Sequence, residues 1–128
     1  MPNFETFSRQ LLPLKSDPYV TLLKRGTIAL NRSAFAALDE PDAVELLYDR
    51  ERDIVGLRPI DPKADHANYV RRSSPSPSGP WLISAMAFTK FYDIDTSVSR
   101  RWAAHLDAGI LCADISTAGI AISRNRAR

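Results

Sequence analysis

The pattern of apolar and polar residues between positions 19 and 60 predicts a compact unit of strand, short helix and hairpin. Residues 19–30 are mainly apolar, and Gly26 marks a bend or bulge within this extended segment. Asn31 or Ser33 can then cap a short helix, because either side chain can accept a hydrogen bond from the first helical N–H groups. The unit therefore begins with a bent strand that leads directly into a capped helix.

A β-hairpin is predicted after this helix, which ends at Pro41. Strands are expected over 43–48 and 53–58, where apolar residues recur. The polar segment Asp49-Arg50-Glu51-Arg52 between them has the length of a hairpin turn. Pro59 closes the second strand, since proline cannot donate to a strand ladder.

The same pattern recurs over residues 79–115 at an offset of 53 positions. Gly26 aligns with Gly79, and the Ala34-Phe35 pair aligns with Ala87-Phe88. The predicted order is a strand, a helix over 85–92 capped by Ser84, and a hairpin with the turn Asp107-Ala108-Gly109. Residues 96–106 also fit a helical period, so strand and helix both stay open for this segment.

The chain of 128 residues is expected to form one domain. It divides into an N-terminal helix or arm (1–18), a first strand–helix–hairpin unit (19–60), a connector rich in proline and serine (61–78), a second unit (79–115) and a basic tail (116–128). One unit has too little core to stand alone, whereas two can close a barrel. The predicted fold class is α+β: a small mixed β-barrel or curled sheet from two related units plus the N-terminal helix.

Charge is distributed unevenly along the chain. The net charge is +3 over residues 1–38, −5 over 39–65 and +4 over 66–128. Such blocks allow one surface to face a polyanion while another surface avoids it. The single cysteine, Cys112, excludes an internal disulfide, and no segment has the length of a membrane span, so we expect a cytoplasmic protein without membrane contact.

The sequence offers little chemistry for catalysis. His66 and His105 lie far apart and fit no metal-ligand spacing, and Cys112 lies in an apolar strand that suits an inert thiol. No glycine-rich phosphate loop is present among five glycines. We therefore expect a protein that is not an enzyme and that uses no cofactor or metal, with a small enzyme as the outside alternative.

The segment YVTLLKRGTIALNRSAFAALDEPDAVELLYDRERDIVGLRPI, residues 19–60, resembles the swapped-hairpin barrel of DNA-binding proteins of the AbrB/SpoVT/MazE type. In that family a basic strand runs through a glycine into a short capped helix, and a hairpin ending near Arg-Pro follows. If residues 79–115 form a second unit, the chain is similar to tandem members with two units in one chain. It departs from the pattern at Thr27, Asn31 and Pro41-Asp42, where the family has a basic residue, a proline and a Gly-Asp step.

This resemblance implies a non-enzymatic, DNA-binding transcriptional regulator. Double-stranded DNA is the expected partner, with phosphate or groove contacts at Lys24, Arg25 and Arg32, supplemented by Arg71 and Arg100. Adjacent arginines in a strand point to opposite faces, so only one of each pair joins a given patch. The alternative function is a protein–protein interaction or oligomerisation module, with another protein or a second copy as its partner.

Four aromatic residues are candidates for base stacking or for core packing. Trp81, Phe88, Phe91 and Trp102 could stack on unpaired bases, but their spacing favours core positions.

Overall fold

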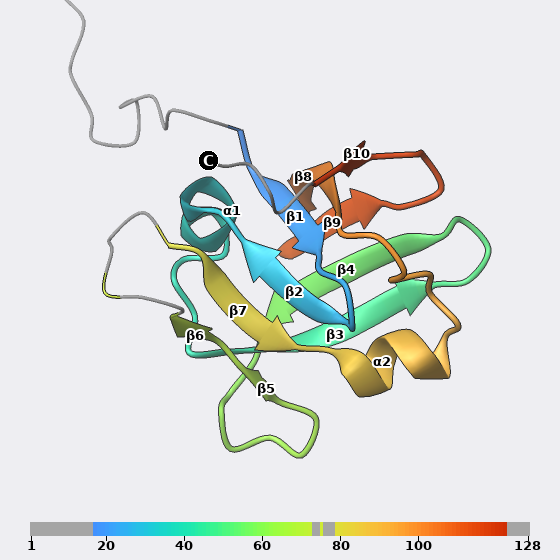
Figure 1. Cartoon of the computed structure of the whole chain (residues 1–128). Helices are drawn as coiled ribbons and strands as arrows, with labels where there is room; N and C mark the ends of the chain where they lie inside the picture. Colours follow the sequence, from blue (N-terminus) through green and yellow to red (C-terminus); the bar gives the residue numbers. More distant parts are fainter. Residues whose placement is uncertain (1–16, 73–74, 76–78, 123–128) are drawn as a thin grey trace, which may run out of the picture.

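The computed structural model describes residues 17–72, 75 and 79–122 of the chain (Figure 1). The elements follow in the order β1 (Tyr19–Leu22), β2 (Thr27–Leu30), α1 (Arg32–Ala37), β3 (Ala43–Asp49), β4 (Ile54–Pro59), β5 (Asn68–Tyr69), β6 (Arg71–Arg72), β7 (Trp81–Ser84), α2 (Met86–Phe91), β8 (Arg100–Asp107), β9 (Ile110–Asp114) and β10 (Ile120–Ala121). The predicted N-terminal helix falls largely on residues 1–16, which lie outside the described residues.

One sheet contains all ten described strands. Its order is β5-β3-β4-β9-β8-β1-β2-β7-β6, with β10 paired to β8 beside this path. The two ends of the path, β5 and β6, are consecutive in the chain and are separated only by Val70, whose N–H donates to the carbonyl oxygen of Asp42 at 2.9 Å. The sheet therefore curls into a nearly closed barrel, with β1, β2 and β7 facing β3 and β4 across it (Figure 1).

The predicted α+β class and mixed sheet are wrong. Every pairing among the described strands is antiparallel. The two described helices have six residues each, which is under two helical turns. Helices this short bury only one or two side chains each, so they cover parts of the barrel and form no layer of their own (Figure 1). The protein is mostly β.

Strands of the two halves interleave around the barrel. We call residues 19–60 the first half and 71–115 the second half, which thereby includes β6 from the predicted connector. The first half supplies β1–β4 and the second half β6–β9, and they alternate along the sheet in pairs: β3-β4, β9-β8, β1-β2 and β7-β6. Each hairpin is thus held by strands of the other half, through the β4–β9, β1–β8 and β2–β7 pairings. Neither half can complete its strand hydrogen bonds alone.

Inward residues of these strands form a single core. The most deeply buried side chains come from alternate positions of strands in both halves: Val20, Leu22, Ile28, Leu30, Val44, Val55, Leu57, Ile83 and Leu111. Trp81 and Trp102 are also buried, and the ring of Phe35 stacks on Trp81 at 4.5 Å between centroids. The expectation of core roles is confirmed for both tryptophans.

The start of α1 is fixed as the sequence predicts. Asn31 caps the helix, and its Oδ1 accepts from the N–H of Ala34 at 2.9 Å. The same oxygen accepts from the N–H of Tyr19 at 3.0 Å, and Nδ2 donates to the carbonyl oxygen of Asp17 at 2.8 Å. Asn31 therefore joins the helix to the start of β1.

The second half departs from its prediction in one place. The residue that caps α2 is Ala85, without a side-chain hydrogen bond, and the predicted cap Ser84 is instead the last residue of β7. In α1 the N–H of Phe35 donates to the carbonyl oxygen of Asn31, and in α2 the N–H of Thr89 donates to the carbonyl oxygen of Ala85. These equivalent residues are 54 positions apart, not 53. The alignment of Ala34-Phe35 with Ala87-Phe88 is therefore wrong by one residue.

Both predicted hairpins are confirmed. β3 pairs with β4 from Val44↔Pro59 to Asp49↔Ile54, and β8 pairs with β9 around the turn at Ala108-Gly109. Of the two alternatives for residues 96–106, the structure has the strand, from Arg100 onward. Neither described helix has the length and apolar character needed to cross a membrane.

Gly26 allows the β1–β2 turn to pack on α2, and its replacement tests this contact. Gly26 has φ +95°, and an added Cβ would lie 2.9 Å from Met86 Cα and 2.8 Å from Thr89 Oγ1. Gly109 also has positive φ, +82°, but a Cβ there meets nothing within 4 Å. We expect Gly26→Ala to lower the free energy of unfolding by roughly 1–3 kcal/mol more than Gly109→Ala, measured by urea denaturation. Equal losses in the two variants would show that the close approach to α2 has no energetic weight.

Candidate nucleic-acid interface

Lys24 and Arg25 form the exposed tip of the turn between β1 and β2. Two backbone hydrogen bonds close this turn, Leu23 N–H to Thr27 O at 2.7 Å and Gly26 N–H to Leu23 O at 2.9 Å. The backbone N–H of Lys24 also donates to Ser99 Oγ at 2.8 Å. The two basic side chains therefore project from a turn that is fixed on both sides.

The α2 helix begins beside this turn. The N–H of Ala85 donates to the carbonyl oxygen of Gly26 at 3.0 Å, and Ser84 pairs with Thr27 across the β2–β7 ladder. Arg71 reaches the same place from β6, since its Nη2 donates to Ser84 Oγ at 3.3 Å. The structure thus brings Lys24, Arg25 and Arg71 to one end of the β2–β7 pair.

Arg32 and Arg100 lie elsewhere. Arg32 is exposed at the first position of α1, at the other end of β2, so about 13 Å of strand separates it from Arg25. Arg100 belongs to β8, where its Nη1 donates to the carbonyl oxygen of Ala118 at 3.0 Å. Its side chain lines a cleft together with Asp95. Arg32 and Arg100 therefore lie outside the group formed by Lys24, Arg25 and Arg71.

Of the adjacent pair Arg100-Arg101, Arg100 was the predicted contact, yet it is Arg101 that lies on the outer face of the sheet. Its partner in the β1–β8 ladder is Thr21, and the next residue, Trp102, is buried. Alternation along a strand indicates that only one of the two adjacent arginines can lie on this face. Because Trp102 packs into the core, as its spacing predicts, Arg101 takes the outer face and Arg100 lies on the same side of β8 as Trp102.

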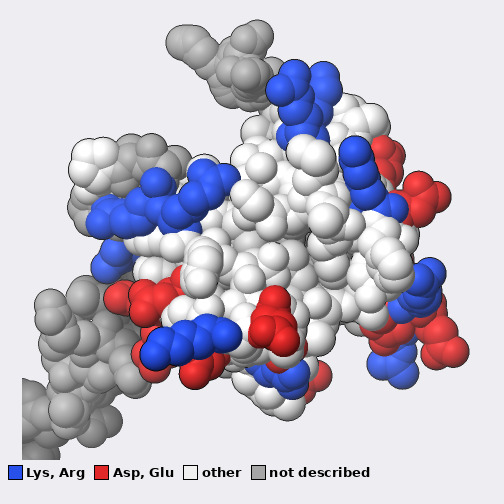
Figure 2. Space-filling model, turned by 90° about the horizontal axis from the view of Figure 1, so that it is seen from below, with Lys and Arg blue, Asp and Glu red and all other residues white. Residues whose placement is uncertain are grey.

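The described acidic residues lie outside one group of adjacent strands, most of them in turns and loops. No Asp or Glu occurs in β1, β2, β6 or β7, which lie side by side in the sheet. Figure 2 shows both kinds of charge on one side of the molecule, with the Lys and Arg side chains in separate groups divided by uncharged and acidic atoms. On the side seen there, the basic residues lie in separate groups and form no continuous patch.

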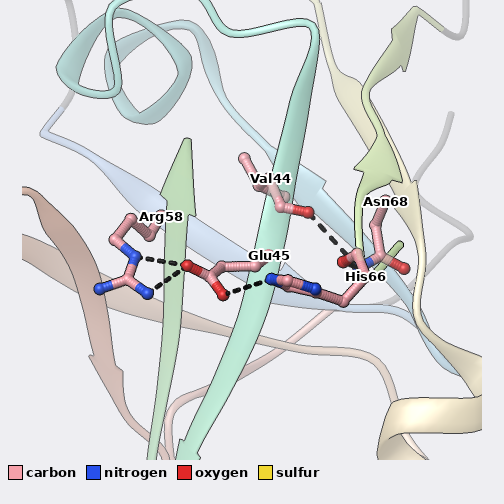
Figure 3. Close-up of polar contacts among 5 residues, drawn as sticks. All are labelled: Val44, Glu45, Arg58, His66 and Asn68. Carbon is pink, nitrogen blue, oxygen red and sulfur yellow. Dashed lines mark hydrogen bonds and ion pairs between the residues drawn. The ribbon is translucent and has the colours of Figure 1, made fainter. Parts of the chain in front are cut away.

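A network on β3 and β4 accounts for part of the acidic block. Glu45, whose side chain is 12% exposed, lies between Arg58 and His66 (Figure 3). Its Oε2 accepts from Arg58 Nε at 2.5 Å, and its Oε1 lies 3.3 Å from His66 Nε2. Asn68 adds a hydrogen bond from Nδ2 to the carbonyl oxygen of Val44 at 3.4 Å. The network ties the loop before β5 to the hairpin and engages Arg58 away from the basic face.

Candidate metal ligands and the single thiol can both be located in the structure. Among residues 17–72, 75 and 79–122, no group of three His, Cys, Asp or Glu side chains could hold a metal ion. Cys112 is partly buried, and this burial raises the pKa of its thiol, with a smaller contribution from Asp107. A raised pKa disfavours the reactive thiolate.

A cleft of about 450 Å³ lies between the β3–β4 hairpin and the loops around β8. Its lining includes Tyr48 and Asp53 on one side and Asp95 and Arg100 on the other. Two hydrogen bonds from Ser97 lower the pKa of Asp95, and Arg100 contributes less. The Tyr48 hydroxyl donates to Asp53, and this bond, with burial, raises the pKa of Tyr48 to about 12.

Three comparisons were made with known proteins. No protein-family match, no curated relative and no similar solved structure was found for this chain.

The Tyr48–Asp53 contact predicts a pH dependence. A tyrosine pKa raised above its ordinary value of about 10 means that folding favours the protonated hydroxyl. The resulting stabilisation is complete below about pH 10 and is lost as the pH rises towards 12. Absorbance titration should show one late tyrosine ionisation that Tyr48→Phe removes and that Asp53→Asn moves to lower pH. The exposed Tyr69 supplies the control, and loss of the late ionisation in Tyr69→Phe would contradict the assignment.

Proposed function

We propose that this protein is a non-enzymatic, DNA-binding regulator that contacts double-stranded DNA with the outer face of β6, β7, β2, β1 and the start of β8. The observation that carries the proposal is the placement of Lys24, Arg25 and Arg71 at one end of four adjacent strands without a single carboxylate. Lys and Arg that approach phosphates release condensed counterions, and no acidic side chain on these strands opposes that approach.

The shape of the face also suits a large, regular ligand. From β6 to β8 the face spans four strand spacings, or about 19 Å. Its outward residues between the basic edges include Thr21, Thr27, Leu82 and Ser84, which are short or uncharged. Such residues let a nucleic-acid backbone approach closely without burying unpaired charge.

The topology adds further support. The resemblance to the AbrB/SpoVT/MazE group implies two units whose hairpins interleave in one barrel. The strand order is consistent with this arrangement. Within the proposal Lys24 and Arg25 are the principal contacts and Arg71 is supplementary. Arg32 and Arg100 stay outside the proposed face because of their positions at the far end of β2 and in the cleft. The protein would act in the cytoplasm, and we propose no cofactor for it.

An interaction module is the second candidate function, and two exposed apolar residues of α2 favour it. Phe91 on α2 is 72% exposed, contrary to its expected core position, and Met86 on the same helix is 51% exposed. Large apolar side chains in water are typical of contact surfaces when they occur together. Light scattering should show a larger species for the native chain than for Phe91→Ser, and one size for both would exclude α2 as an assembly surface.

The DNA proposal predicts a change in salt dependence. Replacing Lys24 and Arg25 together by Ala should weaken binding to a mixed-sequence duplex. It should also reduce the slope of log K against log salt by up to about 1.8, or about 0.9 for each lost phosphate contact. Fluorescence anisotropy at several salt concentrations measures both quantities.

The matched control replaces Arg52 and Lys63 by Ala. This double substitution removes the same net charge as the Lys24/Arg25 variant, but at exposed positions outside the proposed face. It should leave the slope within error of the native value. Equal slopes for the Lys24/Arg25 variant and the native chain would remove the β1–β2 turn from the interface, and an absence of duplex binding at low salt would end the DNA proposal.

A further inference from the structure

Arg101 differs from the other basic residues of the sheet in how its side chain is held. Its Cζ lies 4.7 Å from the ring centroid of Tyr19, so the guanidinium lies over the aromatic face. Cation–π contact positions the charge without using any of its N–H groups. The side chain is only partly exposed although it lies on the outer face of β8.

The Nε–H donor of Arg101 lacks an acceptor within the described part of the chain. Its Nε is shielded from solvent and has no hydrogen-bond partner there. Buried donors are normally paired, and a shielded N–H without an acceptor is unfavourable. Such a group indicates a place where an acceptor from outside the described residues fits.

A groove of about 430 Å³ lies beside this side chain. Ala29 contributes to its floor, and Tyr19, Thr21 and Pro80 line it together with Arg101. Asn31 also lines it, but Oδ1 and Nδ2 of that side chain already bond backbone groups of Ala34, Tyr19 and Asp17. Arg101 is therefore the charged residue of the lining, and it has donors to offer.

The surroundings of the groove favour an anion. The strands that form it, β1, β2 and the first half of β8, contain no carboxylate. Asp17, two residues before β1, forms no ion pair with Arg101 among the contacts of the described residues. A guanidinium offers a planar fork of N–H groups that matches the oxygens of a phosphate.

We propose that Arg101 binds a phosphate group in this groove, with its guanidinium turning from Tyr19 so that Nε and one Nη donate to two phosphate oxygens. In a complex with nucleic acid the phosphate belongs to the backbone, and only this assignment of its source rests on the proposed function. A small phosphate compound would use the same contacts.

The test follows the Nε–Hε signal of Arg101 by NMR in the full chain, assigned by its disappearance in Arg101→Lys. Inorganic phosphate is titrated in one arm and mixed-sequence duplex DNA in the other, with sodium chloride at equal ionic strength as the reference. A saturable shift beyond that reference is expected in both arms. In the DNA arm, anisotropy should show about tenfold weaker binding and a slope reduced by about 0.9 for Arg101→Ala. Arg52→Ala, which removes one exposed charge outside the groove, should change neither.

The outcomes separate the site from its ligand. A shift with inorganic phosphate but not with DNA supports the phosphate site and counts against the DNA function. A shift with DNA and weaker binding by Arg101→Ala assigns the site to a backbone phosphate. Failure of the Nε signal to move beyond the salt reference in either arm would overturn the proposal, whatever the affinity for DNA.

Discussion

The strand pairings between the two halves are the constraint on which the rest of the structure depends. The ladders β2–β7, β1–β8 and β4–β9 each join a strand of one half to a strand of the other. Their inward residues, such as Leu30, Ile83 and Leu111, are completely buried in one shared core. Because backbone groups in a core must be paired, each half satisfies its strands only in the presence of the other.

These pairings also position the candidate interface. The β2–β7 ladder places Ser84 beside Thr27, which brings Arg71 to the turn that carries Lys24 and Arg25. The β1–β8 ladder directs Arg101 outward and buries Trp102. Residues that lie far apart in the sequence therefore share one face because of ladder register, and the charge pattern of that face is a consequence of the fold.

Local signals in the sequence predicted most elements but not the fold class. A basic tail was predicted over residues 116–128, whereas Ile120–Ala121 form β10 and pair with β8. The apolar runs and the polar turn at 49–52 predicted both strands of the first hairpin, and Asn31 predicted the start of α1. The helix over 86–91 begins one residue later than predicted. Ser84 has a side chain suited to a helix cap, but it extends β7 instead. Long-range strand pairing decided that position, and the sequence contains no local trace of it.

The site was only partly predictable for a similar reason. The family resemblance pointed to Lys24 and Arg25, and basic residue type alone pointed to Arg71, but neither predicted the hydrogen bonds that gather them. Alternation and the predicted core position of Trp102 together place Arg101 on the outer face, so the choice of Arg100 for that face was wrong for a reason that the sequence contained. Helical spacing placed Phe91 in the core, whereas the short helix buries Thr89 and leaves Phe91 exposed.

The central claim, that the face formed by β6, β7, β2, β1 and the start of β8 binds DNA, is tested most directly by mapping backbone amide shifts by NMR during titration with a duplex. The account predicts that the shifted amides cluster in the β1–β2 turn and on these strands, while β3, β4 and the loop around His66 stay unchanged. Shifts centred on the β3–β4 hairpin, or no shifts at low salt, would contradict it.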